Sequence, residues 1–139
     1  MKENELIIKI PSKINYIKII EEAFWSYISI NKLENRISSE YLILALVEGV
    51  VNAIKHGNKM DCSKKVKVSL TLEKQYFKII IVDRGDGFDP DCVLDPTLEE
   101  NLSKKDGRGI FIMKKLMDRV EYKFTNNQTK LIMMKQLKE

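Results

Sequence analysis

The chain has 139 residues, 44% of them hydrophobic and 32% charged, which is enough for one domain with a substantial core. Its 24 basic and 20 acidic residues leave a net charge of only +4, and no basic cluster contains aromatic residues, so direct nucleic-acid binding is disfavoured. There is no apolar run of roughly 20 residues to span a bilayer, no signal peptide, and no Cys-x-x-Cys motif for a zinc site. We therefore expect a cytoplasmic protein with reduced thiols and no membrane partner.

The first half of the chain predicts one strand followed by two helices. Residues 5–10 form the strand, and Ser12 is the expected N-cap of a first helix in which isoleucine and phenylalanine recur at helical spacing. A second helix is expected over about residues 39–57, after a polar linker. Gly57 and Asn58 would end that helix as a C-cap pair.

The second half of the chain predicts two pairs of strands separated by a loop and a helix. The loop, residues 84–106, is rich in Asp, Pro and Lys, and Gly107–Gly109 opens the helix. The expected strands are 66–72, 76–82, 120–124 and 130–137. Helices segregated from strands in this way predict an α+β fold, a two-layer sandwich whose mixed, mostly antiparallel sheet is covered by helices on one face.

The second helix contains polar residues in an otherwise apolar segment, VEGVVNAIKHGN. Glu48, Asn52 and His56 recur every fourth residue, a spacing that places them on one side of a helix. An asparagine oxygen suits Mg²⁺, and a glutamate one turn away could orient or deprotonate a nucleophile. The alternative for this triplet alone is a solvated polar edge of a helix.

The segment VDRGDGFDP places a carboxylate at the end of an apolar strand. Asp83 could accept a hydrogen bond from a ligand held against the sheet, and Gly85 and Gly87 would let that ligand approach the backbone. A solvated acidic turn is the alternative for this motif alone.

The segment KKDGRGIFIMKKLMD places two glycines at the start of a helix. Unpaired N–H groups and the positive end of the helix dipole suit a phosphate there. Lys104, Lys105 and Arg108 strengthen that interpretation, although the segment is neither a P-loop nor a complete Gly-x-Gly-x-x-Gly motif.

Taken together, the order and spacing of the three segments resemble the Bergerat-fold ATPases and kinases, the superfamily of gyrase, Hsp90, histidine kinases and MutL. The N box, Glu-x-x-x-Asn-Ala-x-x-His, is matched by Glu48, Asn52, Ala53 and His56. The two glycine boxes are matched by Asp83, Gly85 and Gly87 and by Gly107, Arg108 and Gly109. NAIKHGN, VDRGDGFDP, GRGIFIMKKLMD and the closing hairpin make the chain most similar to the anti-sigma-factor serine-protein kinases of the RsbW type, over residues 5–137.

The resemblance implies a role for each matched residue. Asn52 would ligate a Mg²⁺ that bridges the ATP phosphates, and Glu48 would be the catalytic base that activates an incoming serine. Asp83 would accept the adenine amino group, with Thr129 supporting it from the closing strand, although Gln128 replaces the glycine that usually precedes this threonine. The remaining ATP-binding residues would be Gly85, Gly87, Lys105, Gly107, Arg108 and Gly109, with residues 88–106 as the ATP lid.

The resemblance also implies a function. The protein would sequester a sigma factor, phosphorylate a serine of a STAS-domain anti-anti-sigma protein, and form a homodimer. The alternative is a non-catalytic, ATP-gated protein-binding module of the same fold. A sensor histidine kinase fragment is disfavoured because the single histidine lies in the N box, and gyrase- or Hsp90-like machines would need a second domain.

Overall fold

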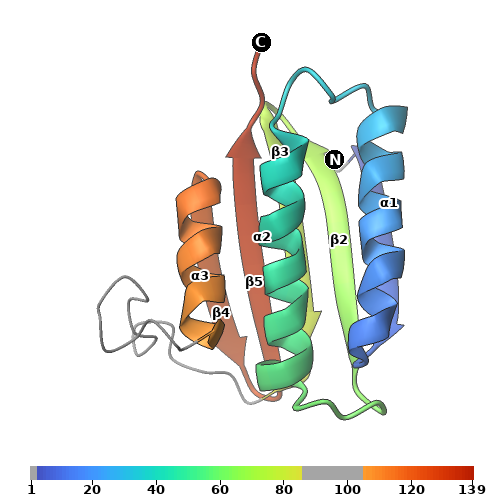
Figure 1. Ribbon diagram of the computed structural model, residues 1–139, viewed down its shortest axis with the longest axis vertical. Coiled ribbons are helices and arrows are strands. Elements are labelled where there is room, and N and C mark those ends of the chain that lie inside the picture. Colours follow the sequence, from blue (N-terminus) through green and yellow to red (C-terminus); the bar gives the residue numbers. More distant parts are fainter. Residues whose placement is uncertain (1–2, 86–104) are drawn as a thin grey trace.

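In the described part of the chain, three helices lie on one face of a five-stranded sheet (Figure 1). The computed structural model describes residues 3–85 and 105–139. The strands are β1 (Glu3–Pro11), β2 (Lys65–Glu73), β3 (Tyr76–Asp83), β4 (Arg119–Thr125) and β5 (Gln128–Gln136). The helices are α1 (Ile17–Ile30), α2 (Ser39–Asn52) and α3 (Lys105–Leu116), with a 3₁₀ turn, η1 (Ile14–Tyr16), before α1 and a π-helical turn, η2 (Ala53–Gly57), after α2. The predicted α+β sandwich is confirmed.

The sheet has the strand order β1-β2-β3-β5-β4, and each described pairing is antiparallel, a more uniform arrangement than the expected mixed sheet. Two-residue turns join β2 to β3 and β4 to β5, and each contains one residue with positive φ, Lys74 at 59° and Asn127 at 63°. The β3–β5 pairing joins these two hairpins into one sheet.

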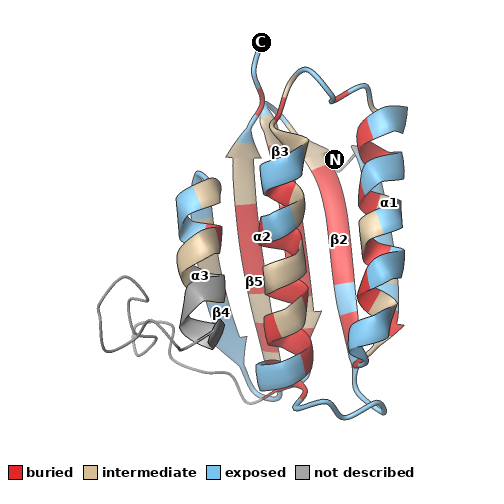
Figure 2. Cartoon of the chain, viewed as in Figure 1, coloured by how far each residue is buried: buried red, intermediate tan, exposed pale blue. Residues whose placement is uncertain are grey.

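The core lies between the helices and the sheet. Along β2, Val66, Val68 and Leu70 are buried and point toward the helices, because side chains alternate between the two faces of a strand. Figure 2 shows buried residues along β2, β5, α1 and α2. Phe24 of α1 packs edge-on against Phe77 of β3, with ring centroids 6.1 Å apart. No helix among the described residues is long and apolar enough to cross a membrane.

One predicted helix cap is wrong, and a second is correct in position only. Ser12 does not cap α1, because its hydroxyl donates a hydrogen bond to the carbonyl of Lys64 and accepts one from Asn58. Gly57 and Asn58 end the helix as predicted, but not in a left-handed conformation, since Asn58 has φ −86° and its N–H bonds the carbonyl of Ala53, five residues back. These residues are engaged in long-range contacts that local sequence does not reveal.

Candidate functional site

Helix α2 brings Asn52 to one end of the sheet. Gly49 allows the close approach, because a Cβ there would lie 2.6 Å from the Cδ1 atom of Ile81. Asn52, in the last turn of α2, is only 5% exposed. Glu48, one turn earlier on the same side of the helix, is half-buried and has interactions of its own.

The predicted polar column does not extend to His56. The helix changes from α to π geometry at Ala53, so later residues no longer follow the four-residue spacing of α2. His56 is exposed, whereas Asn52 is buried. The site can therefore use Glu48 and Asn52, and His56 belongs to the turn that ends the helix.

Strand β3 ends in a buried carboxylate. Asp83 is 4% exposed, and its Oδ1 atom accepts a hydrogen bond of 2.8 Å from the backbone N–H of Gly85. Burial raises the pKa of Asp83 above its ordinary value, while the Gly85 N–H and the positive charge of Lys64 oppose the rise. A buried acid that keeps acceptor capacity is suited to bind a polar ligand.

Two glycines allow the end of α2–η2 to contact the end of β3. A Cβ at Gly57 would come closer than 3.0 Å to the carboxylate of Asp83, and a Cβ at Gly85 would come equally close to the Gly57 backbone. Gly57 is thus required for this close approach, not for a left-handed conformation. The N box and the first glycine box therefore meet directly in the fold.

Thr129 of β5 lies opposite Asp83 in the β3–β5 register. Thr129 is 2% exposed, and its Oγ1 atom has no hydrogen-bond partner among the described residues. The Nδ2 atom of Asn52 has none there with hydrogen-bond geometry either, although the Asn52 amide is close enough to the Tyr122 phenol to affect its pKa. Tyr27 and Ser39 have such atoms too, but they lie on α1 and at the opposite end of α2. Buried polar groups are nearly always paired in folded proteins, so unpaired groups beside Asp83 indicate a ligand site.

Tyr122 of β4 is a site neighbour that the sequence did not single out. Burial raises the pKa of its phenol above the ordinary value, the Asn52 amide opposes the rise, and the charge of Asp83 adds to it. Tyr122 also stacks on Phe124, with ring centroids 6.0 Å apart. In the sequence VEYKF, Tyr122 alternates with charged residues, as expected for a half-buried strand. This alternation was the sequence signal that could have identified it.

Asn58 holds the site together, a role that sequence reasoning missed because it predicted Asn58 only as part of a helix cap. Its buried side-chain Nδ2 donates to Ser12 Oγ at 2.9 Å and to the carbonyls of Lys65 and Lys64 at 3.2 and 3.3 Å. Its Oδ1 accepts a 2.7 Å bond from the backbone N–H of Arg84, the residue between Asp83 and Gly85. One side chain thus joins β1, the start of β2 and the end of β3.

The second glycine box lies in the first turns of α3, which begins at Lys105, so Gly107 and Gly109 are inside the helix rather than before it. Helix α3 packs against α2 (Figure 1). The roles predicted for Lys105, Gly107, Arg108 and Gly109 stay predictions. Gly87 and residues 88–104 of the expected lid lie outside the described residues.

Comparison with known families agrees with this arrangement. A family model described as the histidine kinase-like ATPase domain matches residues 18–135. The chain belongs to this family. The resemblance to Bergerat-fold ATPases and kinases is therefore confirmed.

Among its relatives is a serine-protein kinase RsbW of Oceanobacillus iheyensis, 27% identical over 137 residues, with 91% of this chain and 82% of the relative aligned. The RsbW kinase of Bacillus subtilis is 26% identical, with 86% of this chain and 79% of the relative aligned. An anti-sigma F factor of Clostridium perfringens is 33% identical over 101 residues, which cover 67% of this chain and 69% of the relative.

Solved structures agree on the fold. The RsbU and RsbW domains of a Mycobacterium tuberculosis protein match with a TM-score of 0.68 at 15% identity, over 96% of this chain and 32% of that chain. A blue-light activated histidine kinase of Erythrobacter litoralis matches with a TM-score of 0.56 at 16% identity, over 92% of this chain and 62% of that chain.

Proposed function

We propose that this chain is an ATP-dependent protein serine kinase that also binds a sigma factor. The observation that carries the proposal is the cluster of Asp83, Thr129 and Asn52, three buried polar side chains from β3, β5 and α2. Two of them present polar atoms without partners among the described residues. In this proposal Asp83 and Thr129 bind adenine, and Asn52 lies on the phosphate side.

Magnesium fits this site as a partner of the nucleotide. Among the described residues, no group of three or more His, Cys, Asp or Glu side chains could hold a metal. Mg²⁺ is commonly bound by one or two protein oxygens together with substrate phosphates, and the Asn52 amide supplies one such oxygen. When bound, the ion would neutralise the charge that develops on the transferred phosphoryl group.

Glu48 is the proposed base. It lies one helical turn before Asn52, half-buried, so it would face the phosphate side of the nucleotide without contacting adenine. Its carboxylate would orient the attacking serine hydroxyl and accept its proton. The backbone of Gly107 and Gly109, with Lys105 and Arg108, would contact the phosphates.

The partners are proposed from the relatives. Several are serine-protein kinases RsbW, and one is an anti-sigma F factor. By this analogy the chain would bind a sigma factor in the cytoplasm, phosphorylate a STAS-domain anti-anti-sigma protein, and form a homodimer. A sedimentation experiment with and without ATP would test the dimer.

The nucleotide pocket is tested by calorimetry with Mg-ATP and Mg-GTP. Asn52→Ala should lose metal-dependent affinity, and Asp83→Asn should lose the preference for adenine. Asp118→Asn changes an exposed carboxylate two residues after the C-terminal end of α3; it is the matched control and should bind like the wild type. Unchanged ATP binding in both site variants would refute the pocket.

Kinase activity is tested separately by phosphate transfer from labelled ATP to the STAS partner. Glu48→Gln should reduce the transfer rate by about 10²–10⁴-fold, the usual contribution of a general base, with ATP affinity close to wild type. Glu40→Gln, an exposed glutamate in the first turn of the same helix, should transfer normally. A wild type that binds partners only with ATP yet never transfers phosphate would instead favour the non-catalytic, ATP-gated module.

A further inference from the structure

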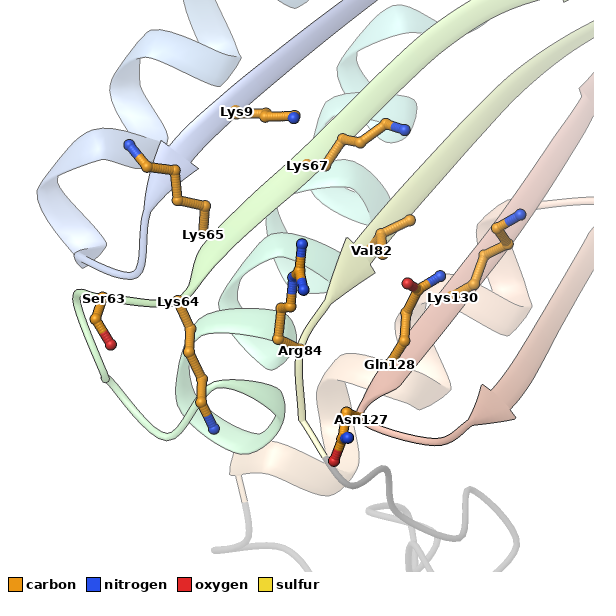
Figure 3. A pocket seen from close by; sticks show the side chains of 10 residues that line it. All are labelled: Lys9, Ser63, Lys64, Lys65, Lys67, Val82, Arg84, Asn127, Gln128 and Lys130. Atoms are coloured by element: carbon orange, nitrogen blue, oxygen red, sulfur yellow. The ribbon is translucent and has the colours of Figure 1, made fainter.

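The face of the sheet opposite the helices carries a basic hollow that the proposed function does not use. The hollow has a volume of about 780 Å³ and lies at the end of the sheet where β2 begins and β3 ends (Figure 3). We call it the basic groove. The described residues that line it include no acidic side chain and six cationic ones: Lys9, Lys64, Lys65, Lys67, Arg84 and Lys130.

The groove lies on the open face because of strand alternation. Val66 and Val68 of β2 are buried under the helices, so Lys65 and Lys67 point to the other side. Asp83 points toward the helices, and its neighbour Arg84 lines the groove. The sheet therefore separates Lys67 and Lys130 from the proposed nucleotide pocket, whereas Lys64, at the end of the sheet, lies close enough to Asp83 for its charge to act on that carboxylate.

The register places lysines side by side across all but the central strand. Lys9 of β1 pairs with Lys67 of β2, and Lys130 of β5 pairs with Lys123 of β4. Val82 of β3 lies between the two pairs. Like charges directly opposite each other destabilise a sheet, so this row opposes folding. Residues that work against the fold without a structural gain are typical of functional sites.

The other end of the same face shows a different arrangement of charge. Lys78 of β3 is paired with Glu73 at 3.1 Å, and Arg119 of β4 is paired with Glu121 at 3.0 Å. None of the ion pairs that the structure shows in its described residues involves a cation of the basic groove. The groove therefore presents positive charge that is available to a partner.

The next row along the strands is mostly apolar. Two residues further along the strands, Ile7, Ser69, Ile80 and Ile132 cross the open face, but only Ile7, at 48%, is well exposed, since Ile80 is 9%, Ile132 8% and Ser69 4% exposed. A ligand that lies across the strands would thus meet positive charge on one side and the exposed Ile7 on the other. We propose that the basic groove binds an acidic, amphipathic segment of a partner protein.

The dimensions of the groove suit a helical segment. Neighbouring strands are about 4.8 Å apart, so Lys9 and Lys67 are about one strand spacing apart, whereas Lys67 and Lys130, with β3 between them, are about twice as far apart. Carboxylates at positions i and i+3 or i+4 of a helix are about 5–6 Å apart, and those at i and i+7 about twice as far, so an acidic helix laid across the strands can match these lysines. Leucine-like residues on its adjacent side would contact Ile7.

A nucleic acid fits this surface less well. None of the described residues that line the groove is aromatic and could stack on bases, and five of the six cations are lysines rather than the arginines that bind phosphates in a fork. A phosphate backbone would also leave the exposed Ile7 without a partner. The chemistry of the whole face therefore favours a protein segment.

The experiment measures the fluorescence anisotropy of a short labelled helical peptide with glutamates on one side and leucines beside them. The wild-type chain should bind it, and higher salt should weaken binding. Lys67→Gln/Lys130→Gln should lower the affinity by about tenfold or more. The control Lys78→Gln/Arg119→Gln changes the net charge by the same amount on the same face and should stay within about twofold of wild type.

Three outcomes would overturn the proposal. These are no binding of the peptide, equal loss of affinity in both double variants, and tighter binding of a DNA oligonucleotide or of polyphosphate through the same lysines. Calorimetry with Mg-ATP on the same variants keeps the two proposals separate. Both double variants should bind ATP like the wild type. Refuting the basic groove would therefore not refute the nucleotide pocket, and refuting the pocket would not refute the groove.

Discussion

Replacing Asn58 by alanine should destabilise the protein more than its position in a surface turn suggests. The side chain is 1% exposed, and its Oδ1 atom is the described partner of the Arg84 N–H. Asn58→Ala leaves that N–H without its partner, at a cost of about 1–3 kcal/mol, and removes bonds to Ser12 and Lys65 worth about 1 kcal/mol each. The free energy of unfolding should therefore fall by about 3–5 kcal/mol.

Urea denaturation followed by circular dichroism measures this loss. For a chain of this length, the midpoint of thermal unfolding should fall by about 10 °C. Asn31→Ala is the matched control, because the Asn31 side chain makes one bond, from Nδ2 to the Tyr27 carbonyl at 3.0 Å, and should cost only about 1 kcal/mol. A cost for Asn58→Ala no larger than for Asn31→Ala would refute the reasoning.

Asn58→Ala should also weaken ATP binding under conditions where the variant stays folded. The Arg84 N–H that Asn58 holds lies in the turn that carries Asp83 and Gly85. Loosening this turn leaves Asp83 less well positioned for a ligand. Calorimetry at low temperature would detect the effect, and full ATP affinity would show that the turn is held by other contacts.

Three further predictions test the site. Gly57→Ala should lower the free energy of unfolding, measured by urea denaturation, by about 1–3 kcal/mol, because its Cβ would meet the Asp83 carboxylate. Gly49→Ala should lower it by less, because its Cβ would meet only the flexible ends of side chains. The reverse order would contradict the close approach. Thr129→Val removes a hydroxyl without a described partner, so stability should change by less than about 1 kcal/mol while ATP affinity falls. The stability of Asp83→Asn relative to the wild type should rise with pH. The raised pKa of Asp83 stabilises the wild-type fold only while the acid is protonated. This contribution is complete below the pKa of the unfolded state, 3.8, and is lost above the pKa of the folded state. Urea denaturation at several pH values would check this. A variant whose stability relative to the wild type falls toward neutral pH would contradict the burial argument.

Local periodicity was enough to predict most of the fold. The alternation of Val66, Val68 and Leu70 predicted the buried face of β2, and the apolar spacing of 39–57 predicted the second helix. The N box and the first glycine box also identified two elements that meet at the site, because Asn52 and Asp83 each stand at the end of a strongly patterned segment.

The remaining features depend on contacts between distant residues. Ser12 has the sequence signature of a helix cap, but its hydroxyl bonds Lys64 and Asn58 instead. Gly57 has the signature of a C-cap, but it is needed because Asp83 packs against its Cα. The lysine row of the open face is also hidden in the sequence, since only strand register decides which residues are opposite each other.

The position of the β3–β5 pairing determines when the site forms during folding. Each hairpin, β2–β3 and β4–β5, closes through a two-residue turn and can form early, whereas the pairing between them joins distant parts of the chain and is expected later. Asp83 belongs to one hairpin and Thr129 to the other, so a growing chain that still lacks β5 contains the acid but not its neighbour. A nucleotide that contacts both residues would bind only the completed sheet and would stabilise the docking of the two hairpins.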